Sequence, residues 1–303
     1  MPRVPSLSMT NAAHDAARGS RIRVGEIDLW VDVDGPEGGD AVVLLAGADS
    51  PGFRWSRALV DPLIAAGYRV VRFDHRDCGR STRLGASDAY LLDDLAGDVV
   101  GLLDELGIAA AHLIGRSMGG MVAQVLALDH AARVRSLSLF GTSPGVGDDR
   151  LPGPDEDFVE KMTYRLFEGP PHDPDGQVVW LVQLAELMNG TLYPLNLETE
   201  TGLARVEVET GWAAETGHGV AAFSSRSRMD RLAEIVAPTL VVHGSADVVL
   251  PIEHGRELAQ GIPGAVYIEV DGLGHEVPDG LIDDMWPVLE HHLREASNWP
   301  ADT

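Results

Sequence analysis

Two stretches of the chain follow the pattern G-x-S-x-G, in which a serine lies between two glycines. Residues 115–119 read GRSMG, and residues 141–145 read GTSPG. A nucleophilic serine in this pattern requires a sharp turn between a strand and a helix, which the flanking glycines permit without side-chain clashes. It also requires a backbone N–H on the next residue, to stabilise the negative charge that develops on the attacked carbonyl oxygen.

Only Ser117 meets both requirements. It follows an apolar run and opens a helical stretch, and Met118 has an N–H to donate at the start of that helix, where the helix dipole favours negative charge. Ser143 is followed by Pro144, which has no N–H, and then by a loop. We therefore predict that Ser117 is a nucleophile, that Met118 is one oxyanion donor, and that Ser143 is a turn residue.

A nucleophilic serine needs a base, and the base needs an acid that orients it. On a strand–turn–helix elbow these residues follow in the chain order Ser, Asp or Glu, His. Asp247 comes after the apolar run 238–244, and His275 comes after the run 265–270. Both lie at the carboxyl ends of predicted strands, where parallel sheets build their sites. Asp271 is a rival acid, but it lies on the same loop as His275. The predicted catalytic triad is therefore Ser117, Asp247 and His275.

The second oxyanion donor is expected in the loop after the first buried strand, which reads LLAGADSPGFRW. Ala48 is the best candidate for its N–H, and Gly47 leaves room for the substrate beside it. Arg116 precedes the predicted nucleophile. It could reach a carboxylate or carbonyl of the substrate, or it could form a salt bridge with an acidic residue of the protein.

Short apolar runs alternate with longer amphipathic runs through most of the chain. We expect strands at residues 27–33, 41–47, 69–74, 110–115, 134–141, 238–244 and 265–270. We expect helices at residues 91–107, 117–130, 252–262 and from about 282 to 295. Strands that alternate with helices predict an α/β fold, with a mostly parallel central sheet flanked by helices.

Residues 144–230 interrupt this alternation, because they contain helical stretches and no clear buried strand. We interpret them as a helical cap inserted into a core formed by residues 21–143 and 231–297. Residues 1–20 are polar and rich in small side chains, so we expect a disordered N-terminal extension.

The predicted cap contains several large side chains that could line an apolar substrate pocket. The alternative is that they form the hydrophobic core of the cap itself. These residues are Trp180, Met188, Tyr193, Trp212 and Phe223. Residues 144–230 also hold 16 acidic against 6 basic residues, which would favour a cationic substrate.

The chain of 303 residues has a formal net charge of −24. This charge argues against binding to nucleic acid or to an anionic membrane surface. It indicates either simple solubility or a pocket that attracts cations. The single cysteine, Cys78, excludes an intrachain disulfide and is compatible with a cytoplasmic location. We expect a monomer or homodimer that acts on a small-molecule ester.

The motifs GRSMGG, HGSADVVLP and GLGHEVP resemble those of the α/β-hydrolase superfamily, from about residue 22 to 292. Within it, LLAGADSPGFRW and RFDHRDCGRST look like the anthracycline methylesterases of actinomycete polyketide pathways, typified by aclacinomycin methylesterase. The resemblance implies hydrolysis of a methyl ester on a polyketide ring, with the cap covering the flat ring system. The polar residues of DHRDCGRST are themselves predicted to form a structural hydrogen-bond and ion-pair network.

Three other functions remain open at this point. The same triad could serve a carbon–carbon bond hydrolase of ring-cleavage products or a cofactor-free perhydrolase, and the fold could also belong to a non-catalytic binding protein. Ester hydrolysis by the triad requires no metal and no organic cofactor.

Overall fold

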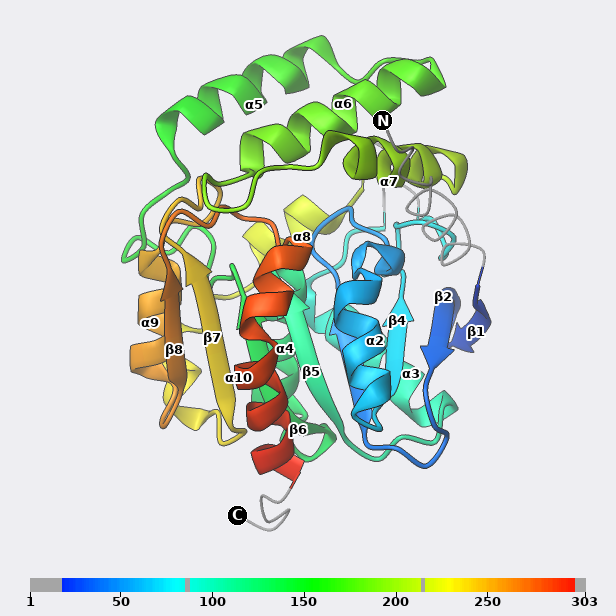
Figure 1. Ribbon diagram of the computed structural model, residues 1–303, viewed down its shortest axis with the longest axis vertical. Helices are drawn as coiled ribbons and strands as arrows, with labels where there is room; N and C mark the ends of the chain where they lie inside the picture. Colours follow the sequence, from blue (N-terminus) through cyan, green and yellow to red (C-terminus); the bar gives the residue numbers. More distant parts are fainter. Residues whose placement is uncertain (1–17, 85–87, 214–215, 298–303) are drawn as a thin grey trace, which may run out of the picture.

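The computed structural model describes residues 18–84, 88–213 and 216–297. Its centre is one eight-stranded sheet with the order β1-β2-β4-β3-β5-β6-β7-β8 (Figure 1). β2 pairs antiparallel with β1 and with β4, and every other neighbouring pair is parallel. The strands are β1 (Ser20–Val24), β2 (Ile27–Asp34), β3 (Ala41–Leu45), β4 (Arg69–Phe73), β5 (Ala111–Arg116), β6 (Val134–Phe140), β7 (Thr239–Gly244) and β8 (Val266–Val270). The predicted mostly parallel sheet is confirmed.

Helices cover both faces of this sheet (Figure 1). α2 (Arg57–Ala65) and α10 (Asp279–Ser297) contact each other on one face, whereas α3 (Leu92–Glu105) and α4 (Met118–Asp129) pair on the other. α9 (Glu253–Gly261) packs against β7 and β8. The short 3₁₀ helices are η1 (Gly52–Arg54), η2 (Ala131–Arg133) and η3 (Met229–Glu234).

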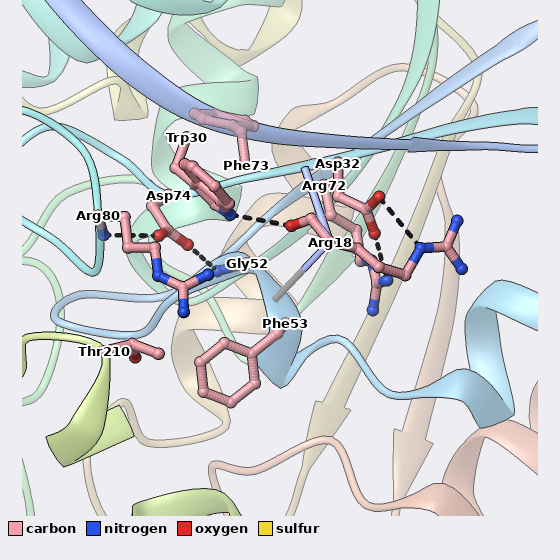
Figure 2. A pocket seen from close by; sticks show the side chains of 10 residues that line it. All are labelled: Arg18, Trp30, Asp32, Gly52, Phe53, Arg72, Phe73, Asp74, Arg80 and Thr210. Atoms are coloured by element: carbon pink, nitrogen blue, oxygen red, sulfur yellow. Dashed lines mark hydrogen bonds and ion pairs between the residues drawn. The ribbon is translucent and has the colours of Figure 1, made fainter. Parts of the chain in front are cut away.

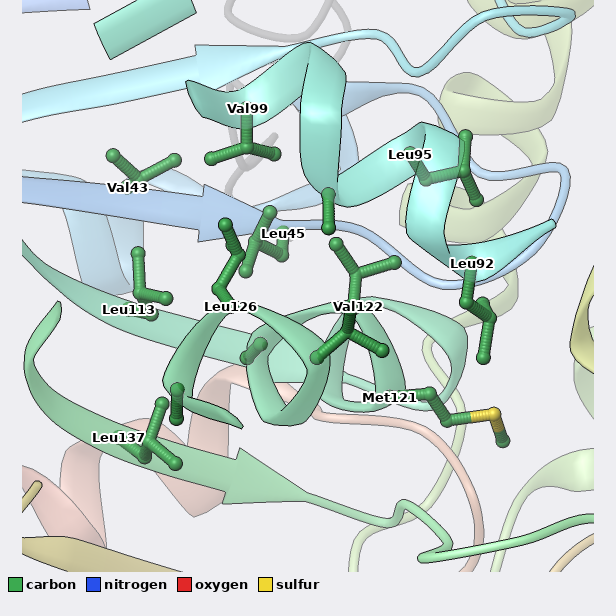
Figure 3. Close-up of a cluster of buried hydrophobic side chains, with 14 of the residues drawn as sticks. Val43, Leu45, Leu92, Leu95, Val99, Leu113, Met121, Val122, Leu126 and Leu137 are labelled. Atoms are coloured by element: carbon green, nitrogen blue, oxygen red, sulfur yellow. The ribbon is translucent and has the colours of Figure 1, made fainter. Parts of the chain in front are cut away.

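Successive side chains of the buried strands point to opposite faces of the sheet, and both sets are apolar, so helices must cover both faces. In β3, Val43 and Leu45 pack with α3 and α4, while Val42 and Leu44 face the opposite cluster formed with α2 and α10. Figure 3 shows the first of these clusters, in which Val122 of α4 lies among aliphatic side chains of the strands and of α3. Because successive strand residues point to opposite faces, a strand that is apolar throughout must be covered on both sides.

Three helices between β6 and β7 lie over the edge at which the parallel strands end (Figure 1). They are α5 (Glu156–Glu168), α6 (Pro174–Met188) and α7 (Leu197–Glu209). The next helix, α8 (His218–Ser224), contacts α4, and Leu232 of η3 belongs to the core cluster. The helices over the edge are therefore α5, α6 and α7, and the chain returns to the core at α8.

Among the strands and α-helices of the core, β1 and α2 were not predicted, for different physical reasons. β1 (SRIRV) is an edge strand of five residues in which Ile22 and Val24 alternate with arginines, and this pattern is too short to identify a strand without its pairing with β2. α2 carries Pro62 in its interior, which is an unfavourable helix position. Of the predicted extension at residues 1–20, residues 1–17 lie outside the described part of the chain, and Ser20 already begins β1.

Among the residues described, no helix combines the length and the apolar composition needed to cross a bilayer.

Candidate active site

Ser117 lies on the turn between β5 and α4 with φ +52° and ψ −122°. A non-glycine residue in the left-handed region stores strain, which the surroundings must hold. Its N–H donates to the Phe140 carbonyl at 3.0 Å, and its carbonyl accepts the Thr142 hydroxyl at 2.6 Å. The second glycine of the pattern, Gly119, packs directly against the backbone at the end of β3. A Cβ at this position would lie 2.1 Å from the Leu45 carbonyl oxygen, so no larger residue fits.

The structure brings Ser117, His275 and Asp247 together. His275 Nε2 lies 2.9 Å from Ser117 Oγ, and His275 Nδ1 lies 2.8 Å from Asp247 Oδ2. An ionised carboxylate only accepts hydrogen bonds, so Nδ1 carries the proton and Nε2 is free to accept the serine proton. Asp247 and His275 are each only 5% exposed. The three residues come from the ends of β5, β7 and β8, as their positions in the sequence predict.

The Asp247 carboxylate is fixed by several donors. Its Oδ1 accepts the N–H groups of Val249 and Leu250, each at 2.9 Å, and His243 Nε2 lies 3.4 Å from its Oδ2. Burial raises the pKa of Asp247, but the charge of His275 and the hydrogen bonds from both histidines outweigh it and hold the pKa below its ordinary value. The carboxylate is therefore ionised and oriented, as a residue that fixes the imidazole must be.

The His275 loop is held by the end of α6. The His275 N–H donates to the Met188 carbonyl at 2.9 Å, and the Gly272 carbonyl accepts the Thr191 N–H at 2.7 Å. A Cβ on Gly190 would lie 2.2 Å from the Gly272 carbonyl oxygen. The segment that leaves α6 thus contacts the backbone of the loop that carries the candidate base.

The predicted oxyanion donors occupy two neighbouring segments. Met118 is the first residue of α4, so its N–H has no partner within the helix. The loop after β3 passes beside the nucleophile, because a Cβ on Gly47 would lie 3.4 Å from the Cβ of Ser117. Ala48 follows on this loop and is exposed. Both N–H groups therefore belong to backbone that flanks Ser117.

Ser143, the serine of the second G-x-S-x-G stretch, is fully buried. Its hydroxyl accepts the Gly145 N–H at 2.9 Å and lies 2.8 Å from His254 Nδ1. His254 Nε2 in turn lies 3.0 Å from the Pro152 carbonyl. These contacts tie the turn after β6 to α9 and leave the serine without access to solvent, which agrees with its predicted structural role.

A partly buried group of charges lies next to the candidate triad, and of its members only Arg116 was identified from the sequence. Arg54 Nη1 and Nε donate to Glu200 and Glu207 of α7 at 2.6 and 2.8 Å. Arg116 pairs with Glu276. Burial, and then the nearby Arg54, lowers the pKa of Arg116 to about 10. No sequence signal marks these pairs, because each joins residues about 150 positions apart.

The predicted pocket residues occupy different environments, and only some lie near the candidate triad. Trp180 stacks under Arg165 at 3.9 Å, and Trp212 packs against the core of α6 and α7. Met188 contacts His275 through its carbonyl. Tyr193 donates its hydroxyl to Asp284 of α10 at 2.7 Å. Phe223 is 67% exposed, and its ring lies against Gly147, so the structure does not bring it to Ser117.

The segment DHRDCGRST forms the hydrogen-bond network that its composition predicts. Figure 2 shows Asp74 accepting the N–H groups of Gly52 and Arg80, at 2.8 and 2.9 Å, while Arg80 covers the ring of Trp30. The adjoining hollow has a volume of about 20 Å³, room for a single water molecule. Asp74 thus joins the loop after β3 to the loop after β4, and this hollow is too small for a substrate.

In the part of the chain that the structure describes, no three His, Cys, Asp or Glu side chains are grouped so that they could hold a metal ion.

A serine on the turn after the central strand, with a histidine and an aspartate at later strand ends, defines the class of α/β hydrolases. The family with the α/β hydrolase fold matches residues 41–279, and the chain belongs to it. The predicted superfamily is therefore confirmed, and the protein is a hydrolase of this fold.

Individual relatives cover nearly the whole chain. The chain is 29% identical over 293 residues to rhodomycin D methylesterase DnrP of Streptomyces peucetius, covering 90% of this chain and 97% of that protein. It is 33% identical over 271 residues to 2-hydroxy-6-oxononadienedioate/2-hydroxy-6-oxononatrienedioate hydrolase 2 of Pseudomonas putida, covering 86% and 90%. Its fold resembles the enol-lactonase from Burkholderia xenovorans LB400, with a TM-score of 0.68, 24% identity, and coverage of 92% and 100%. The predicted resemblance to anthracycline methylesterases is confirmed.

Proposed function

We propose that this protein is a serine carboxylic-ester hydrolase. The observation that carries the proposal is the relay of two short contacts, 2.9 Å from Ser117 Oγ to His275 Nε2 and 2.8 Å from His275 Nδ1 to Asp247. This geometry provides a nucleophile, a base in reach of its proton, and an acid that orients the base.

In the proposed mechanism, Ser117 Oγ bonds to the ester carbonyl carbon while His275 Nε2 takes the hydroxyl proton. Asp247 holds the imidazole and stabilises the imidazolium. The N–H groups of Ala48 and Met118 donate to the oxyanion, each contributing roughly 3–4 kcal/mol. The intermediate collapses, the bond to the alkoxide breaks, and His275 protonates that leaving group. Water repeats the sequence on the acyl-enzyme, so the steps require no metal or organic cofactor.

We propose a methyl ester of a bulky, apolar, polyketide-like molecule as the substrate, and a role in antibiotic biosynthesis. The support is the similarity to rhodomycin D methylesterase over 90% of the chain. In this proposal α5, α6 and α7 form a cap over the site, and Met188, Trp212 and Trp180 contribute to its apolar inner surface. Gly47 leaves room for the substrate beside Ser117. We further propose a cytoplasmic monomer or homodimer.

A second candidate is carbon–carbon bond hydrolysis on the same triad. The observation that favours it is the 33% identity to the Pseudomonas putida hydrolase. A perhydrolase and a non-catalytic binding protein are the further alternatives that the same fold allows.

The test combines covalent labelling with a substrate panel. Purified protein is treated with a fluorophosphonate and mapped by mass spectrometry, with Ser117→Ala as the matched control. The panel contains an anthracycline methyl ester, simple esters, a ring-cleavage diketone, and peroxide with a halide. Labelling at Ser117 with methanol release from the anthracycline ester supports the full proposal.

Each other result assigns a different function. Labelling with turnover of simple esters only contradicts the polyketide substrate. Turnover of the diketone alone, or halogenation with peroxide, replaces ester hydrolysis by the corresponding alternative. A Ser117→Ala protein with wild-type turnover, or a wild-type protein that does not label, contradicts the serine mechanism.

A further inference from the structure

His218 is a buried histidine that the proposed mechanism does not use. It begins α8, at the return of the chain from the helices over the sheet edge to the core, and its side chain is fully buried. Its ring packs edge-on against His75, with ring centroids 6.0 Å apart, and against Tyr90 at 6.2 Å. These contacts fix the plane of the imidazole.

Two backbone groups determine which nitrogen of His218 carries the proton. His218 Nε2 lies 2.7 Å from the Arg76 carbonyl oxygen, which can only accept a hydrogen bond. His218 Nδ1 lies 2.8 Å from the Asp49 N–H, which can only donate one. The Asp49 carboxylate also approaches this nitrogen, with Oδ1 at 3.3 Å from Nδ1, but the shorter contact is with the N–H, so the Nδ1 lone pair accepts the Asp49 amide and the proton is on Nε2.

Asp49 adjoins the candidate oxyanion donor in the loop after β3. We call residues 46–50 the oxyanion loop. Asp49 has φ +59°, a left-handed conformation that is strained for a residue with a side chain. Besides the bond from its N–H to His218, its carboxylate accepts the hydroxyl of Thr216, two residues before His218. The strained residue is thus held by backbone and side chain from the same short segment.

Holding the Asp49 N–H fixes the peptide plane that follows Ala48. The Ala48 N–H lies in the preceding peptide plane and projects from the backbone at the Ala48 Cα, so fixing the following plane holds the position of this Cα and limits the displacement of the Ala48 N–H. Preorganised donors stabilise an oxyanion because they need no reorganisation during the reaction.

We propose that His218 is a positioning residue that locks the oxyanion loop in the conformation in which Ala48 donates to the oxyanion. The inference rests on the proposed function, because it assigns a role in stabilising the ester transition state. It also connects the return segment of the helices over the sheet edge to the catalytic geometry, since His218 and Thr216 both lie on that segment.

Two substitutions of His218 distinguish the role of Nδ1 as a hydrogen-bond acceptor from the contribution of the rest of the imidazole. In His218→Asn, Oδ1 stands at the position of Nδ1 and can accept the Asp49 N–H. In His218→Gln, the terminal amide can still donate to the Arg76 carbonyl, but no acceptor stands at the Nδ1 position. Both variants lose the ring, so a purely structural role would affect them alike. Thermal melts establish that each is folded.

We expect His218→Gln to lower kcat by roughly 10–100-fold, somewhat less than the loss of an oxyanion donor, with KM changed less than about threefold. His218→Asn should recover most of this loss. A thionoester supplies a readout specific to the oxyanion, because sulfur is a weaker hydrogen-bond acceptor than oxygen. The preference of the wild type for the oxygen ester over the matching thionoester should shrink in His218→Gln and return in His218→Asn. Equal losses in both variants, or an unchanged preference, would overturn the inference.

Amide hydrogen exchange tests the contact independently of turnover. The Asp49 amide of the wild type should exchange slowly although its side chain is exposed, and it should lose this protection in His218→Gln but not in His218→Asn. Fast exchange in the wild type contradicts the inference even if no variant folds. Absence of both fluorophosphonate labelling and ester turnover in the wild type contradicts the proposed function instead, and the exchange measurement then still decides whether His218 holds the loop.

Discussion

Arg116 and Glu276 form an ion pair, and each is the immediate neighbour of a candidate catalytic residue. Arg116 precedes Ser117, and Glu276 follows His275. Their side chains are 15% and 26% exposed. The pair therefore joins the turn that carries the nucleophile to the loop that carries the base, in an environment that is largely shielded from water. Of the two roles expected for Arg116, the structure shows the salt bridge within the protein.

Removing the carboxylate of this pair should destabilise the fold. In Glu276→Gln the buried Arg116 loses its counter-charge close to Arg54, so the free energy of unfolding should fall by about 1–3 kcal/mol. Urea unfolding measures the change. The matched control is Glu290→Gln, which removes an exposed pair with Arg294 and should change stability by no more than about 0.5 kcal/mol. Equal effects of the two substitutions would contradict the prediction.

The contact between Arg54 and α7 predicts a larger effect. Arg54→Met leaves Glu200 and Glu207, which are 8% and 5% exposed, without their shared cation. Loss of one partner of a buried ion pair destabilises proteins by about 3–5 kcal/mol. The triple variant that adds Glu200→Gln and Glu207→Gln removes the uncompensated charges and should recover most of the stability in urea unfolding. A single variant that loses less than about 1 kcal/mol would show that the cluster is not desolvated.

The close packing at the elbow predicts that Gly119→Ala is inactive or unfolded. Its new Cβ would meet the carbonyl oxygens of Leu45 and Ala46 at 2.1 and 2.5 Å, and these backbone atoms cannot move aside cheaply. Displacing the elbow by about 1 Å should lower kcat roughly 100-fold. Gly97→Ala is the control, because its Cβ on α3 meets open space and should stabilise the helix by about 0.5–1 kcal/mol. Wild-type kcat in Gly119→Ala would contradict the packing argument.

The depressed pKa of Asp247 predicts how stability depends on pH. Its folded pKa lies below the ordinary value of 3.8, so its ionised form stabilises the fold above that pH, and the contribution is lost as the pH falls through the folded pKa. The difference in unfolding free energy between the wild type and Asp247→Asn should be constant above roughly pH 5. Below that pH the wild type should lose stability relative to Asp247→Asn, because its carboxylate becomes protonated. Guanidinium unfolding at a series of pH values measures this difference. A difference that changes mainly above pH 5 would assign the titration to another group.

The net charge of −24 predicts a salt effect that depends on the charge of the substrate. For a cationic ester, kcat/KM should fall at least roughly threefold as ionic strength rises from low to physiological values, because salt screens the attraction. A neutral ester of the same shape should show no such fall. Identical salt dependence for the two esters would contradict the preference for cations expected from the sequence and leave solubility as the consequence of the charge.

Much of the fold could be predicted from the sequence, because each buried strand is recognisable as a short apolar run. The run at residues 41–47 predicted β3 within two residues, since a strand covered on both faces must be apolar throughout. β1 and α2 could not be predicted in this way. β1 depends on its partner β2, and α2 tolerates Pro62 in a helix that packs Leu59 and Leu63 into the core.

The candidate triad was accessible from the sequence for a related reason. Ser117, Asp247 and His275 each follow a recognisable strand, and parallel strands bring their carboxyl ends to one edge of the sheet. The choice of Ser117 over Ser143 followed from one covalent fact, the missing N–H of Pro144. These assignments depend on local patterns and on the general topology of α/β sheets.

The sequence by itself therefore determined the class of fold, the positions of most strands along the chain and the residues proposed for chemistry. Only the tertiary structure decided which groups support them. His218 and Asp49 are 169 positions apart, and Arg116 and Glu276 are 160 apart. Pairs of this kind leave no periodic signal along the chain, because a single charge or imidazole acquires its partner only when the chain folds.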